Sequence, residues 1–275
     1  MKNIWVPLSG QIAQQRKVET IANNIANANT NGFKKDELAF KEHLTALTQG
    51  GDIIDLPRKE WKPDDFYRSQ GAENAYVKVD GSYTNFEQGA LNPTGNPLDM
   101  ALFGKGFFEV QTPNGVRYTR TGNFSLSQNG ELVTEQGFKL LGELTKKDDG
   151  SLNTDDSIES RLIKIPPNEK ISISKEGEIF SKSGKIGKIS LVEFNDLVAL
   201  RKQGSSLYIN NAEDNIKREN VATTVNQGFM EGSNVNAVKE MSELINAHRH
   251  FENIQKAINT YDSISGRIVN DIADF

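Results

Sequence analysis

The acidic pairs Asp64-Asp65 and Asp148-Asp149 are the residues of this sequence whose type could support acid–base chemistry. Two carboxylates on either side of a cleft can hydrolyse a glycosidic bond, one acting as the acid and the other as the base or nucleophile. Both pairs stand beside proline, glycine or lysine, in segments typical of exposed loops, and nothing in the sequence places one pair opposite the other. We interpret them as solvated loop acids, with a secreted carbohydrate-active β protein as the alternative.

Other chemistry has less support. The absence of cysteine excludes disulfides, thiolate nucleophiles and cysteine-ligated metal centres. His248 and His250 are two residues apart, which places them on different faces of a helix rather than at metal-ligand spacing. Gly104-Lys105-Gly106 lacks the third glycine of a dinucleotide-binding loop and precedes a predicted strand, so we interpret it as a turn. We expect no catalytic residue, no cofactor and no bound metal.

Charge and hydropathy exclude two kinds of partner. The net charge is −5 and no basic patch stands out, so nucleic acid is not an expected partner. No stretch approaches the roughly 18 consecutive apolar residues of a membrane span. The apolar run at the N-terminus stops at Ser9, too short for a cleavable secretory signal. We therefore expect the protein either to stay in the cytoplasm or to leave by a route that keeps its N-terminus intact.

The N-terminal segment has a helical period from about Leu8 to Asn27. Its predicted apolar stripe consists of Leu8, Ile12, Val18, Ala22 and Ile25, with Ile21 at the edge. The helix should end near the turn signal Asn31-Gly32. Five asparagines within residues 23–31 disfavour a helix, which leaves two interpretations open: amides that bond to neighbouring chains or backbone, or a frayed end rich in capping residues.

The middle of the chain changes character twice. Leu38, Phe40, Leu44 and Leu47 could form a second short helix, followed by an extended segment to about residue 80. From about residue 81 to 228 the period becomes two, with predicted strands at 106–110, 116–119 and 171–174. Asn114-Gly115, Asn129-Gly130 and Glu176-Gly177 are predicted turns between strands. Many short strands without helices between them indicate an all-β domain.

The last 41 residues predict one long helix with an a/d seam. The seam residues, at steps of three and four, are Leu244, Ala247, Phe251, Ile254, Ile258, Tyr261, Ile268 and Ile272, with Ser265 as the polar interruption. Such a helix would be about 60 Å long and needs a partner helix, for which the N-terminal stretch is the nearest candidate. The predicted fold class is α+β: paired N- and C-terminal coiled-coil-like helices flanking an inserted all-β domain.

Three blocks of sequence resemble the axial rod and hook proteins of the bacterial flagellum. The blocks are Ala22–Asn27 with Thr30–Phe33; Gln88–Leu91, Thr94–Asp99, Gly104–Phe108 and Tyr118–Phe124; and Glu231–Asn236 with Glu240-Met241. They follow the family's order and cover about half to two-thirds of the chain. Within the family, the Glu231–Asn236 block and the length look most like the proximal rod subunit, with the distal rod or a hook-type subunit as the alternative.

The resemblance implies a structural subunit of the flagellar basal-body rod, exported by the flagellar export apparatus without a cleaved signal and located in the periplasmic rod. It implies four segments: residues 1–35 and 231–275 as paired core helices, 36–80 as a connector and 81–230 as an outward β domain. Expected partners are other copies of the chain and neighbouring rod subunits, and the ends are expected to fold on assembly. The expected assembly residues are Leu8, Ile12, Val18, Asn23, Asn24, Ile25, Asn27, Leu244, Phe251, Ile254, Ile258 and Tyr261. A cell-surface adhesin with a coiled-coil stalk is a further alternative, but it would call for a signal peptide.

Overall fold

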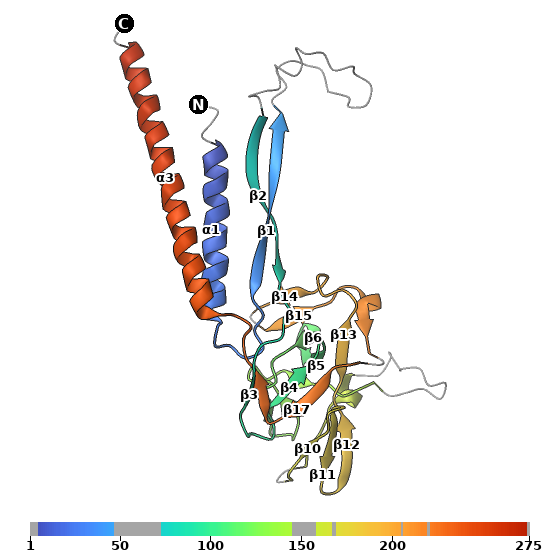
Figure 1. Ribbon diagram of the computed structural model, residues 1–275. Helices are drawn as coiled ribbons and strands as arrows, with labels where there is room; N and C mark the ends of the chain where they lie inside the picture. The colour runs from blue at the N-terminus through green and yellow to red at the C-terminus, as the bar shows by residue number, and fades with distance from the viewer. Residues whose placement is uncertain are drawn as a thin grey trace, which may run out of the picture. The chain divides into compact units, whose positions relative to one another are not determined.

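A computed structural model of the chain describes residues 5–46, 73–144, 158–166, 169–204, 206–218 and 221–273. Over these residues, long helices α1 (Trp5–Ala26) and α3 (Ala237–Ala273) stand before and after a series of short strands (Figure 1). The predicted α+β fold, with helices flanking a β-rich region, is therefore confirmed.

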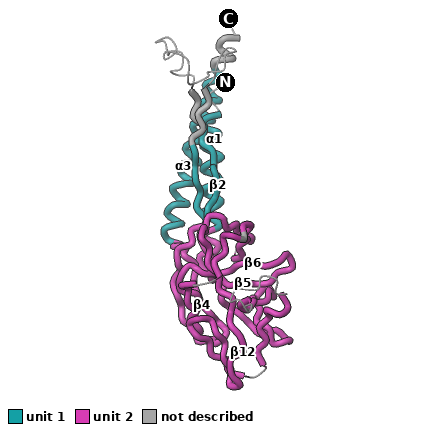
Figure 2. Tube along the Cα trace, turned by 90° about the vertical axis from the view of Figure 1, so that its right-hand side faces the viewer, with its two compact units in different colours: residues 1–23, 36–83, 238–275 teal, residues 24–35, 84–237 magenta. Residues whose placement is uncertain are grey.

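The chain forms two compact units (Figure 2). The helix unit contains residues 1–23, 36–83 and 238–275, and the β unit contains residues 24–35 and 84–237. Each unit is thus assembled from segments far apart in the sequence.

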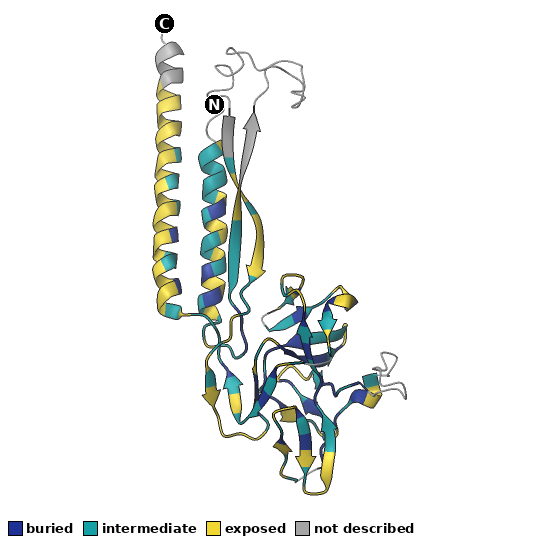
Figure 3. Cartoon of the chain, turned by 45° about the vertical axis from the view of Figure 1, so that its right-hand side comes forward, coloured by how far each residue is buried: buried dark blue, intermediate teal, exposed yellow. Residues whose placement is uncertain are grey.

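The helix unit contains α1, α3 and a pair of strands. The helices run in opposite directions (Figure 1). Because α1 has 22 residues and α3 has 37, α3 is longer by about 20 Å. Most positions along α3 are exposed (Figure 3).

The strands of the helix unit are β1 (Asp36–Ala46) and β2 (Glu73–Thr84), which pair with each other. The predicted second short helix is therefore wrong over its described part. Leu38, Phe40 and Leu44 all occupy even positions, so they share one face of a strand as readily as they fit a helix. Pairing with β2, far along the chain, decides between the two patterns. The end of that prediction, Leu47, lies outside the described residues, as do residues 48–72.

The β unit contains the remaining strands. They are β3 (Leu91–Pro93), β4 (Met100–Phe103), β5 (Phe107–Thr112), β6 (Gly115–Thr119), β7 (Ser125–Leu126), β8 (Leu132–Val133), β9 (Lys139–Leu140), β10 (Ser172–Ile173), β11 (Glu178–Ser181), β12 (Gly184–Lys188), β13 (Leu191–Phe194), β14 (Arg201–Gln203), β15 (Leu207–Ile209), β16 (Ile216–Lys217), β17 (Thr224–Gln227) and β18 (Phe229–Glu231). Two single-turn 3₁₀ helices, η2 (Ile158–Arg161) and η3 (Glu213–Asn215), lie among them.

Strand β5 is the centre of the largest sheet in the described chain, whose main path is β14-β15-β6-β5-β9-β8-β7, with β13 also paired to β5. Adjacent side chains on a strand point to opposite faces, so Phe107 and Phe108 enter two different cores. Phe108 packs with Met100 and Val110 in one core. Phe107 packs in the other, with Tyr118 and Tyr208 among its members. The Gly-Lys-Gly motif is therefore a turn into the most deeply buried strand.

The end of the β unit returns to its beginning. Strand β17 pairs with β4, and β18 pairs with β3, so residues 224–231 lie beside residues 91–103. The predicted turn glycines Gly115, Gly130 and Gly177 all have positive φ angles, of 99°, 76° and 82°. At Gly115 the turn closes the antiparallel β5–β6 hairpin, in which Thr112 is opposite Gly115.

Candidate assembly surface and its anchor

Helices α1 and α3 pack against each other along the predicted seam of α3. A Cβ atom added to Gly10 would lie 3.8 Å from Cδ1 of Ile254, which is the separation of two helices in van der Waals contact. Going along α3, the less exposed positions recur at steps of four and three: Glu240, Leu244, Ala247, Phe251, Ile254 and Ile258. The heptad period of the sequence is thereby confirmed.

On α1 the buried positions differ from the predicted stripe. Ala13 and Ile21 are buried, whereas Ile12 is 53% exposed and Ala22 is also exposed. Small residues such as Gly10 and Ala13 let a neighbouring helix approach closely. A prediction that weights positions by hydrophobic size therefore selects Ile12 and misses Ala13.

Apart from the asparagines, the predicted assembly residues occupy two environments in the structure. Leu8, Val18, Ile25, Leu244, Phe251, Ile254 and Ile258 are half-buried. Ile12 and Tyr261 are exposed, Tyr261 at 59%. Their assignment to an assembly interface remains a prediction.

The asparagines at the end of α1 also differ in exposure. Asn24 is buried at 2% exposure, while Asn23 is exposed. Asn27 follows the last helical residue, and its side-chain oxygen accepts a hydrogen bond from Thr30 Oγ1 at 3.2 Å. At Asn27, then, the amide bonds within a local turn, as a capping residue would.

Several large apolar side chains on the helices face solvent. On α3, Val238, Met241 and Ile245 are spaced at steps of three and four and are each at least half exposed. Trp5 on α1 is 59% exposed. Exposed apolar groups gathered at helical spacing are typical of surfaces that another protein covers.

A buried ion cluster anchors the β unit where the chain enters and leaves it. Glu231 accepts hydrogen bonds from Lys34 Nζ at 2.6 Å and from Arg120 Nη1 at 3.4 Å. The three side chains are no more than 1% exposed. We call Lys34, Arg120 and Glu231 the anchor.

Backbone groups complete the anchor. Gly89 N–H donates to Glu231 Oε1 at 3.0 Å, Lys34 Nζ donates to the carbonyl of Glu87 at 2.7 Å, and Arg120 Nη2 donates to the carbonyl of Gly104 at 2.6 Å. Burial lowers the pKa of Lys34, and it also lowers the pKa of Arg120, although the charge of Glu231 opposes both effects. The two cations thus depend on one carboxylate.

Close backbone contacts surround the anchor. A Cβ on Gly89 would lie 2.1 Å from the carbonyl oxygen of Gly232, and one on Gly32 would lie 2.7 Å from the nitrogen of Thr121. Asn234 adds a polar link, because its Oδ1 accepts from Lys35 N–H at 2.8 Å and its Nδ2 donates to the Asn85 carbonyl at 2.8 Å. Residues 32–35 are therefore held against the segment that precedes α3.

Comparison with known proteins identifies the family. Three family descriptions match: "Flagella basal body rod protein" at residues 6–34, "Flagellar hook protein FlgE/F/G D1 domain" at 101–181, and "Flagellar basal body rod FlgEFG protein C-terminal" at 226–271. The flagellar basal-body rod protein FlgF of Caulobacter vibrioides is 31% identical over 95% of this chain and 94% of its own. FlgG of Bacillus subtilis is 31% identical over 98% of each chain, and FlgG of Borreliella burgdorferi is 31% identical over 99% of this chain and 98% of its own. The chain belongs to the flagellar rod protein family.

Each anchor residue of this rod-family chain lies in a different matched segment. Lys34 ends the first segment, Arg120 lies in the second and Glu231 in the third. Arg120 and Glu231 lie in the motif blocks quoted from the sequence, which give neither residue a role. The available signal is that each is the single charged residue of its block, Tyr118–Phe124 or Glu231–Asn236.

A second buried carboxylate, Glu109 on β5, joins segments within the β unit. Its carboxylate forms ion pairs with Arg161, which is in hydrogen-bond contact, and with Arg218, whose Nη2 lies 2.9 Å from Oε1. It also accepts a hydrogen bond from Ser190 Oγ at 2.6 Å. Burial alone would raise the pKa of Glu109, but Arg161 and Arg218 together with Ser190 hold that pKa below its ordinary value. This cluster fixes η2 and the segment after β16 to the central strand.

The residues first considered for chemistry lie apart from these clusters. Asp64, Asp65, Asp148 and Asp149 are outside the described residues. His248 pairs with Glu252 at 3.3 Å on the exposed side of α3. In the described ranges, no three histidine or acidic side chains gather as they would to hold a metal ion. No helix in the described part of the chain has the length and apolar character needed to cross a membrane.

Proposed function

We propose that this protein is a structural subunit of the bacterial flagellar basal-body rod, which assembles into a helical axial tube and transmits torque across the periplasm. The observation that carries the proposal is the antiparallel helix pair with exposed apolar side chains on α1 and α3, in a chain related over nearly its full length to rod proteins. The relatives are named flagellar basal-body rod proteins, and for that reason we do not propose the carbohydrate-active alternative.

The proposal assigns roles to the parts of the chain. Residues 1–35 and 231–275 form the axial core, residues 81–230 face outward, and residues 36–80 connect them. Partners are other copies of this chain and neighbouring rod subunits, and the flagellar export apparatus delivers the chain to the basal body. Within the rod we propose the proximal position, which the Glu231–Asn236 block and the chain length favour, with the distal position as the alternative.

The test is a substitution in the helix seam. Phe251→Asp puts a charge among half-buried α3 residues opposite α1 and is expected to abolish rod assembly and motility while leaving the β unit folded. Asn253→Asp, at an exposed polar position of the same helix, is the matched comparison for the effect of an added charge on helix formation alone. Normal motility and rod length in the Phe251→Asp strain would contradict the seam assignment.

A further inference from the structure

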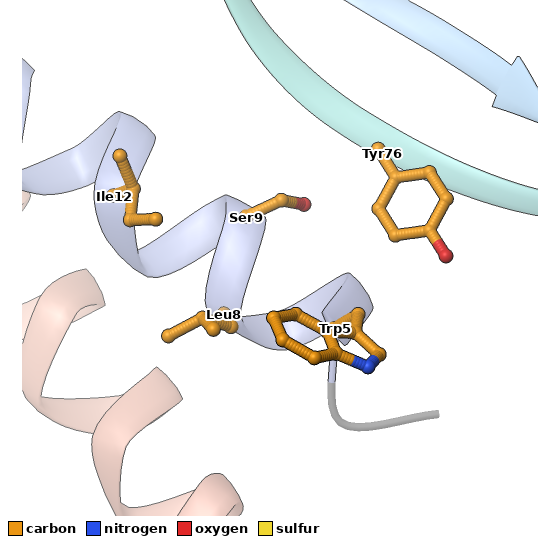
Figure 4. Close-up of a pocket in the computed structure, with 5 residues that line it drawn as sticks. All are labelled: Trp5, Leu8, Ser9, Ile12 and Tyr76. Atoms are coloured by element: carbon orange, nitrogen blue, oxygen red, sulfur yellow. The ribbon is translucent and has the colours of Figure 1, made fainter. Parts of the chain in front are cut away.

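An open apolar groove lies in the helix unit between α1 and β2. Its volume is about 440 Å³, and it is lined by Trp5, Leu8, Ser9, Ile12 and Tyr76 (Figure 4). Four lining residues come from α1, and Tyr76 faces them from β2. Volumes of this size are typical of sites that bind another molecule or side chain, roughly 300–1,000 Å³.

The groove suits an apolar occupant. None of the lining side chains is charged, and the hydroxyl of Ser9 is already used: it donates to the Val6 carbonyl at 2.7 Å and accepts from Val77 N–H at 3.1 Å. Trp5 and Ile12 both remain more than half exposed. Exposed tryptophan with neighbouring isoleucine and tyrosine is the composition that dominates binding energy at protein interfaces.

The described part of α3 carries an exposed apolar segment. The seam of α3 is half-buried as far as Ile258, but Tyr261 is 59% exposed and Ile264 is 49% exposed. Gly10 is level with Ile254, so Ile264 lies about 15 Å further along α3, whereas Trp5 is only about 8 Å from Gly10 in that direction. The segment around Tyr261–Ile264, which we call the overhang, therefore extends past the first described residue of α1.

The overhang cannot fill the groove of its own chain. Helix α3 is continuous through Ala273 and runs antiparallel to α1 (Figure 1), so the overhang lies beyond Trp5 and not beside the groove. A continuous helix cannot turn back around α1 to reach it.

We propose that the overhang of one copy, with Tyr261 and Ile264, docks in the groove of a second copy of this chain. Tyr261 continues the seam that already packs on α1, and Ile264 adds an exposed apolar side chain about one turn further along, so the overhang offers the same kind of apolar surface as that interface. A contact between two different surfaces of identical chains extends into an open helical filament when the rotation from one copy to the next does not close a ring. This inference rests on the proposed function, because it names the contact by which successive copies in the rod join.

Cysteine cross-linking tests the contact directly, because the natural chain has no cysteine. Ile12→Cys and Ile264→Cys variants, with tags of different size, would be co-expressed in a strain that lacks the wild-type gene, and isolated basal bodies would be oxidised and resolved without reductant. We expect a mixed disulfide dimer at least tenfold more abundant than in the control pair Glu19→Cys and Ile264→Cys. Glu19 is exposed on the same helix but outside the groove.

The outcomes separate the inference from the proposed function. Basal bodies that contain both variants without the mixed dimer would overturn the inference and leave the rod function intact. Equal cross-linking of the Ile12 and Glu19 pairs would also overturn the inference and leave the rod function intact. So would a Trp5→Ala variant that blocks assembly while no mixed dimer forms, since a different subunit would then occupy the groove. Absence of both variants from basal bodies overturns the proposed function and the inference together.

Discussion

Removing the charge of Glu231 should destabilise the β unit more than any change to an exposed ion pair. Glu231→Gln keeps the size of the side chain, but it leaves the Lys34 and Arg120 cations buried without the carboxylate that both contact. Breaking a buried pair by removing one partner costs about 3–5 kcal/mol. Because the amide oxygen introduced by this substitution could still accept the Gly89 N–H bond, we expect the lower end, about 3 kcal/mol, a factor of roughly 100 in the folding equilibrium.

The assay is urea unfolding of the purified chain, followed by far-UV circular dichroism. With a slope of about 2 kcal/mol per molar urea, the midpoint of the β-unit transition should fall by about 1.5 M. Glu178→Gln is the matched control, since Glu178 pairs with Lys185 at 2.7 Å on the surface and should cost no more than about 1 kcal/mol. Adding Lys34→Met to Glu231→Gln should recover part of the loss by removing one unpaired cation. A Glu231→Gln midpoint equal to that of Glu178→Gln would refute the role assigned to the anchor.

Three further predictions concern the β unit and the termini. The pKa of Glu109 is lowered in the folded chain, so near and below its ordinary value of 4.5 the unfolded chain binds more protons than the folded chain. The free energy of unfolding should therefore fall as the pH drops through the folded-state pKa. The unfolding midpoint, measured against pH, should decline less steeply in Glu109→Gln than in the wild type, and parallel curves would argue against this. Gly122→Ala should lower the free energy of unfolding by at least about 3 kcal/mol, because its Cβ would lie 1.5 Å from the Met100 carbonyl oxygen. Gly187→Ala, with open space around the added Cβ, should leave the thermal unfolding midpoint nearly unchanged. Limited proteolysis of the dilute free chain, read by mass spectrometry, should trim both terminal helices and leave a core that retains residues 24–35 and 84–237 of the β unit, and intact terminal helices would contradict folding on assembly.

The parts of the fold that local pattern decides could be predicted from the sequence. The seam of α3 repeats over several heptads, and the turn glycines at 115, 130 and 177 punctuate strands of period two, so both signals are contained in short windows. Leu38, Phe40 and Leu44 fit either period, so the pattern alone does not decide between helix and strand for residues 36–46. Their strand form depends on β2, whose first residue is Glu73.

The candidate site depends on contacts that no local pattern contains. Lys34, Arg120 and Glu231 are separated by most of the chain, and their pairing follows from strands β17 and β18 returning to β4 and β3. The buried face of α1 differs from its most apolar stripe for another reason: Ala13 is small enough for close packing and is buried, while the larger Ile12 is exposed. The overhang of α3 follows from the difference in length between α1 and α3. A helical period does not fix the first residue of a helix, so the sequence does not predict the overhang.

The most direct test of the central claim is an in-frame deletion of the gene combined with purification of basal bodies from a strain that carries a tagged copy. The account predicts that the tagged chain is found in the rod by mass spectrometry and immunolabelling, and that the deletion strain forms no complete rod and does not swim. Complete basal bodies and normal swimming in the deletion strain, with the tagged chain absent from purified basal bodies, would contradict it.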